Sequence, residues 1–299
     1  MILLGEHAAV YDKHVLAIPL PDAVNAQVVE IDAAESRVTI PGWAINQPVA
    51  ARNPEPGAAE VVALIQRELG LADRQFHVRV DASIPAAMGL GASAAMAVAA
   101  IRGFDALLGL GMDNRAVDAL AFECEKLAHG TPSGIDNNIA TYGQPVLYTR
   151  TTASRTRPLQ LAEPPPLVIA SSGRRGITRD VVAGVRERYE RNTALYDTLF
   201  AEIDELSVAG AVALRDRHYE QLGAMMNVCQ GFLNAIEVST PELEHMIHVA
   251  RKHGAVGAKL TGAGGGGSIV ALCPGRCRDV AAALEHAGYS IIRMSNDNG

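Results

Sequence analysis

Residues 84–95 read Ile-Pro-Ala-Ala-Met-Gly-Leu-Gly-Ala-Ser-Ala-Ala and join a predicted strand to a predicted helix. The strand covers His77–Ala82, where apolar and polar residues alternate, and the strongly apolar helix runs from Ser93 to Leu108. Closely spaced glycines let a backbone approach a phosphate, and a helix start presents free N–H groups and the positive end of its dipole. The candidate phosphate-binding residues are therefore Gly89, Leu90, Gly91, Ala92 and Ser93, and the Ser93 hydroxyl could also hold Mg²⁺.

The same loop also satisfies the dinucleotide-binding fingerprint G-x-G-x-x-A. That fingerprint requires an acidic residue about 20 positions further on, at the end of a second strand. The nearest acid, Asp105, falls inside the predicted helix, and several strands precede the motif. The motif alone favours phosphate binding, and leaves dinucleotide binding or a plain tight turn as alternatives.

A second candidate segment covers Glu125–Asn138 and reads EKLAHGTPSGIDNN. Asp136 could act as a general base, although an aspartate in such a turn-rich segment is also a common helix cap. Glu125 lies on a helix predicted over Asn114–Ala128, where an acid is usually solvated, and His129 by itself is interpreted as structural. The clustering of these residues beside a Gly-Pro-Ser loop favours a functional site.

The third segment is Lys259–Ser268, which contains four consecutive glycines. Ordering such a run costs conformational entropy, so it is expected where backbone amides surround a ligand closely. It is not a Walker A loop, because no G-K-[ST] follows and the next predicted element is a strand, Ser268–Cys273. The alternative is a flexible surface linker, but the apolar residues on both sides favour anchoring in a sheet.

The whole chain has 299 residues and a formal net charge of −7, which argues against a general nucleic-acid binder. Its longest apolar run, near Ala94–Ile101, is too short for a membrane helix, which needs roughly 20 residues. The N-terminal stretch has no basic flank. Only Cys273 and Cys277 are close in sequence, and no second Cys or His pair stands at zinc-site spacing, so we expect a cytoplasmic protein with free thiols and no membrane partner.

Pro164–Pro166 cannot sit inside a helix or a central strand, so we place a domain boundary there, with domains at 1–163 and 164–299. Both halves mix strands and helices. Further predicted helices cover Ala58–Leu69, 178–209, 217–235, Pro241–His253 and Gly275–Ala287, and further predicted strands cover two segments within Ile2–Ile18, then Gln27–Ile31, Arg37–Ile40, Leu167–Ser171 and Ser290–Met294.

The three loops, in this order, resemble those of the GHMP small-molecule kinases, and within that group those of the mevalonate kinases. The likeness extends to G-E-H-A-A-V-Y at 5–11 and to Thr178-Arg179, and the most specific match is H-G-T-P-S-G-I-D-N at 129–137. The resemblance implies an α+β fold with a ribosomal-S5-like N-terminal ATP-binding domain and a ferredoxin-like C-terminal domain. It also implies ATP-dependent phosphorylation of the 5-hydroxyl of mevalonate and, by analogy, a homodimer.

The resemblance further assigns roles to individual positions. Asp136 corresponds to the catalytic base, Ser93 and Glu125 to the Mg²⁺ ligands, and Gly89–Ser93 to the loop around the ATP phosphates. The positions that correspond to the mevalonate side are Glu6, His7, Thr178, Gly262, Ala263 and Gly264.

Two positions depart from the family pattern. Ala92 stands where the family usually has the first of two serines, which predicts at most a modest weakening of nucleotide binding. The family also has a lysine beside the catalytic aspartate, and Met1 aligns just after it, so either a short N-terminal piece is missing or the protein works without that cation. The alternatives are a sister kinase acting on phosphomevalonate or a sugar, a nucleotide-binding relative with little or no turnover, and, more distantly, a dinucleotide-dependent oxidoreductase.

Overall fold

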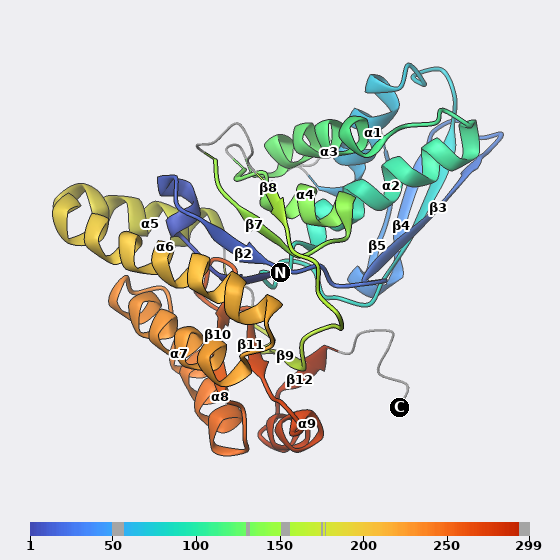
Figure 1. The fold of residues 1–299 in the computed structure, drawn as a ribbon. Helices are drawn as coiled ribbons and strands as arrows, with labels where there is room; N and C mark the ends of the chain where they lie inside the picture. The colour runs from blue at the N-terminus through green and yellow to red at the C-terminus, as the bar shows by residue number, and fades with distance from the viewer. Residues whose placement is uncertain (50–56, 130–131, 151–155, 175, 177, 293–299) are drawn as a thin grey trace. The chain divides into compact units, whose positions relative to one another are not determined.

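The computed structural model of the chain describes residues 1–49, 57–129, 132–150, 156–174, 176 and 178–292 (Figure 1). Their packing divides them into two compact units, each built from more than one stretch of chain. We call unit 1 the described residues within 1–19, 87–90 and 144–292, and unit 2 those within 20–86 and 91–143. The segment at 84–95 therefore contributes to both units, because the chain leaves unit 2 after Ala86 and returns to it at Gly91.

Unit 2 contains a mixed sheet in the order β3-β6-β4-β5. β6 (Phe76–Ala82) pairs antiparallel with β3 (Val24–Glu30) and parallel with β4 (Arg37–Ile40), which in turn pairs antiparallel with β5 (Ile45–Pro48). Phe76, Val78 and Val80 of β6 are buried, whereas the intervening residues are more exposed. The alternation in this stretch thus has the period of a strand with one face on the core.

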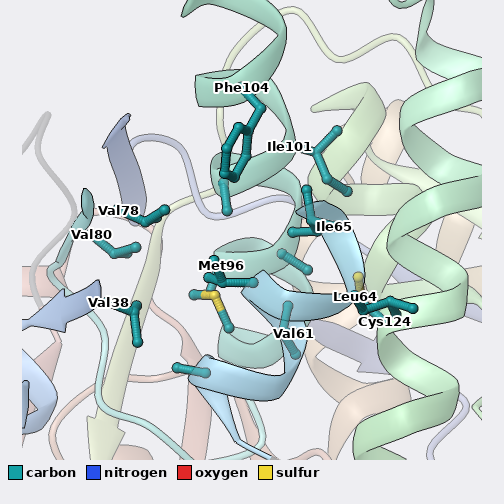
Figure 2. Packing of buried hydrophobic residues seen from close by; sticks show 14 of the residues in the cluster. Val38, Val61, Leu64, Ile65, Val78, Val80, Met96, Ile101, Phe104 and Cys124 are labelled. Atoms are coloured by element: carbon teal, nitrogen blue, oxygen red, sulfur yellow. The ribbon is translucent and has the colours of Figure 1, made fainter. Parts of the chain in front are cut away.

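Helices α1 (Ala58–Glu68), α2 (Ala92–Leu108) and α3 (Asn114–His129) bury their apolar faces in the core of unit 2. Figure 2 shows Met96, Ile101 and Phe104 of α2 in this cluster together with the valines of the sheet. The rings of Phe76 and Phe104 meet edge to face with 5.0 Å between their centroids. This core fixes the axis of α2, whose first turn carries Ala92 and Ser93 of the candidate phosphate-binding residues.

A fourth helix of unit 2, α4 (Ile135–Tyr142), follows α3 and carries Asp136 in its first turn. Between the two helices, Gly130 and Thr131 of the second candidate segment lie outside the described residues. Upstream of the phosphate loop, η2 (Pro41–Trp43) places the Trp43 indole so that Nε1 donates to the Ile84 carbonyl at 2.8 Å. This bond attaches the start of the segment at 84–95 to the sheet of unit 2.

Unit 1 contains two antiparallel sheets, in the orders β1-β2-β7-β8 and β10-β11-β9-β12. The first sheet consists of β1 (Ile2–Leu4), β2 (Val15–Ala17), β7 (Val146–Tyr148) and β8 (Thr156–Pro158). The second consists of β9 (Leu167–Ser171), β10 (Gly257–Thr261), β11 (Ser268–Leu272) and β12 (Ser290–Ile292). β10 and β11 are buried along their whole length, which anchors the glycine-rich loop between them at both ends, as predicted.

The helices of unit 1 are η1 (Ala8–Tyr11), α5 (Thr178–Arg191), α6 (Thr193–Arg215), α7 (Tyr219–Ala235), α8 (Pro241–Lys252) and α9 (Cys277–His286). The prediction of one helix over 178–209 is wrong, because α5 ends at Arg191 and α6 starts two residues later and continues to Arg215. Asn192 is the N-cap of α6, and its side chain accepts from the Leu195 amide at 3.4 Å. Asparagine is a strong N-cap residue, so the sequence carried the signal for this break.

The other long predicted helices agree with the structure within a few residues, and the mixture of helices and sheets confirms the α+β class. The last predicted strand is present as β12 up to Ile292, and its predicted residues 293–294 lie outside the described part. Among the described residues, no helix combines the length and the apolar character that a bilayer span requires.

Candidate active site

The phosphate loop ends in an uncapped helix start. Gly89 and Gly91 have φ angles of +76° and +70°, and α2 begins immediately afterwards at Ala92. Because its N-cap, Gly91, has no side chain, the first amides of α2 receive no side-chain cap from it. These N–H groups and the positive end of the helix dipole form an anion-binding arrangement in unit 2.

Gly89 lies in unit 1, where it packs against the glycine-rich loop between β10 and β11. A β-carbon on Gly89 would stand 2.6 Å from the Thr261 carbonyl oxygen, and one on Gly262 would stand 2.6 Å from the Gly89 Cα. The two backbones therefore approach more closely than any side chain would allow. The glycines of both motifs serve this mutual contact, which sequence reasoning did not predict.

Ser93 and Glu125 meet in unit 2, 32 residues apart in the chain. The Ser93 hydroxyl on α2 donates to Glu125 Oε1 on α3 at 2.5 Å. Glu125 is only 5% exposed, so its carboxylate is held in place rather than solvated, contrary to the usual expectation for a helical acid. A hydroxyl and a carboxylate side by side are oxygen ligands of the kind that Mg²⁺ prefers.

Asp136 lies against the end of the phosphate loop. A β-carbon on Gly91 would stand 3.1 Å from Asp136 Oδ1, so the absence of a side chain at Gly91 leaves the space that this carboxylate occupies. Asp136 belongs to the first turn of α4, where the helix dipole favours a negative charge. Unit 2 thus brings together Gly91, Ala92, Ser93, Glu125 and Asp136, all of them candidates from the sequence.

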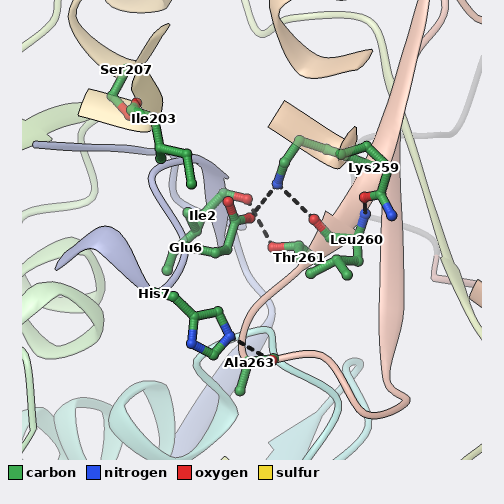
Figure 3. A network of polar contacts seen from close by, with 10 residues as sticks. Ile2, Glu6, His7, Ile203, Ser207, Lys259, Leu260, Thr261 and Ala263 are labelled. Carbon is green, nitrogen blue, oxygen red and sulfur yellow. Dashed lines mark hydrogen bonds and ion pairs between the residues drawn. The ribbon is translucent and has the colours of Figure 1, made fainter. Parts of the chain in front are cut away.

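A buried ion pair joins the N-terminal segment to β10 in unit 1 (Figure 3). Lys259 Nζ contacts Glu6 Oε1 and donates to the Leu260 carbonyl at 2.6 Å, and both charged side chains are fully buried. Burial raises the pKa of the Glu6 carboxyl, and the Lys259 ammonium opposes that rise. Glu6 Oε2 is buried and has no hydrogen-bond partner in the described part of the chain.

His7 follows Glu6 and connects to the glycine-rich loop. Its Nε2 lies 2.8 Å from the Ala263 carbonyl oxygen, as Figure 3 shows. Burial lowers the pKa of the imidazole to about 4, so the ring is neutral at pH 7. Since a carbonyl can only accept, Nε2 carries the proton and Nδ1 is left as an acceptor. His7 also has a φ of +60°, an uncommon conformation for a residue with a side chain.

Unit 1 therefore brings Glu6, His7, Gly262 and Ala263 into one region, through the ion pair, the histidine bond and the β10–β11 loop. Gly264 belongs to the same loop and is buried against Val238. Thr178 is the exposed first residue of α5, and none of the hydrogen bonds among the described residues joins it to Glu6, His7 or Ala263. Lys259 lies in the third candidate segment, but its role could not be predicted from the sequence. No periodic pattern of residues indicates that a lysine is buried.

The chain matches the family model for the GHMP kinases N terminal domain over residues 57–144 and that for the GHMP kinases C terminal over residues 211–290. It is 36% identical to the mevalonate kinase of Pyrococcus horikoshii, with 99% of this chain and 94% of that protein covered. It is also 36% identical to the mevalonate kinase of Methanothermobacter thermautotrophicus, with 95% and 91% covered.

Among solved structures, the chain is similar to the crystal structure of L. major mevalonate kinase in complex with R-mevalonate. The TM-score is 0.84 at 25% identity, and the match covers 98% of this chain and 94% of that one. Identity above 30% over nearly the full length, together with both family models, establishes the relationship. The chain therefore belongs to the GHMP kinase family and, within it, to the mevalonate kinases.

Proposed function

We propose that this chain transfers the γ-phosphoryl group of ATP to the 5-hydroxyl of mevalonate. The main observation behind the proposal is that Asp136 lies against Gly91, at the end of the uncapped phosphate loop. The Ser93 hydroxyl, in the first turn of α2, and the Glu125 carboxylate, on α3, meet in the same unit. The names of the relatives and the mevalonate bound in the L. major protein support the choice of substrate.

The proposed roles follow from the chemistry of phosphoryl transfer, which depends mainly on positioning and charge neutralisation. The backbone amides of Gly89–Ser93 bind the phosphates. Ser93 and Glu125 would hold Mg²⁺, which would supply positive charge to offset the negative charge of the phosphates. The mevalonate hydroxyl oxygen bonds to the γ-phosphorus as the bond to the β-phosphate oxygen breaks. Asp136 accepts the hydroxyl proton, and ADP leaves.

The mevalonate side is proposed to consist of Glu6, His7, Thr178 and the loop residues Gly262, Ala263 and Gly264. His7 supports this role because its neutral ring offers Nδ1 as an acceptor for a substrate hydroxyl while Nε2 holds the loop. The Lys259 ammonium is engaged by the Glu6 carboxylate and the Leu260 carbonyl. A cytoplasmic location and a homodimer stay predictions; sedimentation velocity tests the latter.

The experiment is a coupled ADP-release assay with Mg²⁺-ATP and, in turn, mevalonate, phosphomevalonate, galactose and homoserine. It is run on this chain and on a version extended by the Gly-Lys of the family pattern. Turnover with mevalonate in either version supports the proposal, and the comparison measures what the extra lysine contributes. Turnover with another acceptor only, or ATP binding without turnover in both versions, contradicts it in favour of a sister kinase or a binding-only relative.

A further inference from the structure

The helix that carries Asp136 is short and has a weak start. α4 has eight residues and begins after Gly134, which has a φ of +84° and no side chain with which to cap the helix. Ile135 and Ile139 are buried and attach one side of α4 to unit 2 by apolar contacts. Apolar contacts are not directional, so they define the rotation of so short a helix about its axis less sharply than hydrogen bonds do.

A directional contact to α3 comes from the residue next to Asp136. Asn137 Nδ2 donates to Asp118 Oδ1 at 2.7 Å and lies 3.5 Å from the Asp118 carbonyl oxygen. Both asparagines are almost fully buried, at 3% and 8% exposure. Successive residues of a helix are about 100° apart around its axis, so fixing Asn137 also fixes the direction in which Asp136 leaves α4.

The two asparagines have few other partners. Their Oδ1 atoms are buried and, within the described residues, accept no hydrogen bond. Asp118 is thus the polar anchor of the Asn137 side chain. Burial raises the pKa of the Asp118 carboxyl, and the hydrogen bonds from Asn137 and Asn138 counteract this rise, so the two amides support the ionised form.

From this arrangement, which rests on the proposed function of Asp136, we propose that Asp118 is a positioning residue for phosphoryl transfer. Its carboxylate on α3 holds Asn137 and thereby aims the Asp136 carboxylate past Gly91 at the acceptor hydroxyl. Asp118 itself touches neither substrate. Its removal should therefore lower kcat with little change in the KM for ATP, because small errors in the placement of a catalytic group are costly.

The test is a double-mutant cycle with mevalonate and Mg²⁺-ATP, in which Asp118→Ala and Asp118→Asn are each combined with Asp136→Asn. We expect Asp118→Ala to lower kcat by about 10- to 100-fold while the KM for ATP stays within about twofold. Asp118→Asn keeps one acceptor oxygen and should restore a large part of kcat. Neither change should lower the residual kcat further once Asp136 is asparagine, because the group they aim is then gone.

Glu123→Ala is the matched control, since Glu123 is an exposed carboxylate on the same helix that pairs with Lys126. It should leave kcat within about twofold. If the thermal melt shows that Asp118→Ala does not fold, the double-mutant cycle is measured with Asp118→Asn instead. We then expect kcat to fall by about three- to tenfold.

The proposal is overturned if a folded Asp118→Ala keeps kcat within twofold, or if the same fractional loss persists in the Asp136→Asn background. The single Asp136→Asn variant separates the positioning role of Asp118 from the proposed function, in which Asp136 is the base. Near-normal turnover in that variant contradicts the role of Asp136, whatever Asp118 does. A large loss there combined with a silent Asp118→Ala contradicts only the positioning role.

Discussion

The buried pair of Lys259 and Glu6 allows a sharp prediction about stability. Lys259→Met replaces the lysine by an apolar side chain of similar length, so the packing around it changes little. The carboxylate of Glu6 then lies in a site where its side chain is 0% exposed and its counter-ion is gone, and its Oε2 already has no hydrogen-bond partner among the residues that the structure describes. The Leu260 carbonyl also loses the ammonium that donates to it.

Breaking a buried ion pair by removing one partner typically costs about 3–5 kcal/mol, because the other charge stays buried and unpaired. A volume-conserving apolar replacement adds less than about 1.5 kcal/mol. We therefore expect Lys259→Met to lower the free energy of unfolding of unit 1 by about 3–5 kcal/mol at pH 7.5. Adding Glu6→Gln removes the unpaired charge and should recover about 2 kcal/mol or more of that loss.

The assay is urea unfolding followed by circular dichroism at 222 nm, because α5 to α9 of unit 1 contribute much of the helix signal. Fluorescence of the single tryptophan, Trp43, reports on unit 2 in the same samples. Lys252→Met serves as the matched control, since Lys252 is exposed at the end of α8, and it should change stability by no more than about 0.5 kcal/mol.

The sign of the pH dependence gives a second check. Without Lys259, the already raised pKa of the Glu6 carboxyl rises further, so the folded variant binds this proton more tightly than the unfolded chain does. The deficit of Lys259→Met should therefore shrink as the pH falls towards 5. The prediction is wrong if Lys259→Met loses less than about 1.5 kcal/mol of unfolding free energy at pH 7.5. It is also wrong if the loss stays the same when the pH falls and when Glu6→Gln is added.

Three further results are expected. Glu125→Gln should raise the Mg²⁺ concentration needed for half-maximal turnover, because the amide is a weaker ligand; an unchanged magnesium titration contradicts this. His7 is neutral when folded, with a pKa near 4 against 6.5 for the free side chain, so stability should fall by up to about 3 kcal/mol as the pH drops from 7 to 4. In His7→Gln, the urea midpoint should fall less steeply with decreasing pH, because the titrating group is gone. The same pH dependence in both proteins would contradict the role of His7. Gly89→Ala should destabilise unit 1 by about 1–3 kcal/mol more than Gly275→Ala does, since both glycines belong to unit 1 and have positive φ but only Gly89 meets the Thr261 carbonyl; equal melting temperatures would show that the close approach is unimportant.

Strongly periodic segments were predictable from the sequence. The helix predicted over Ala58–Leu69 is α1, and the alternation at His77–Ala82 is β6. β10 was not predicted, because its Lys259 interrupts an apolar pattern and its burial depends on a partner more than 250 residues away, Glu6. β5, β7 and β8 are short strands that depend on pairing with distant neighbours rather than on a local signal.

In the candidate site, too, local features were predictable from the sequence and long-range contacts were not. Glycine spacing and a helix start predict an anion site at 89–93, since both signals are local. Spacing cannot place Glu125 beside Ser93 or Asp136 beside Gly91, because these contacts depend on how α3 and α4 pack on α2; their roles came from the family resemblance. The boundary at residue 163 stays a prediction from the prolines at 164–166, and unit 1 draws residues from both sides of it.

Asp136 is proposed to act as the base in phosphoryl transfer from ATP to mevalonate. The most direct measurement is the kcat of Asp136→Asn with mevalonate, together with its ATP affinity by calorimetry and Asp81→Asn, an exposed carboxylate on β6, as the control. We predict a loss in kcat of at least about 10²-fold, the scale of general-base removal, with ATP affinity within about twofold and the control unchanged. Turnover close to that of the parent chain would contradict the claim.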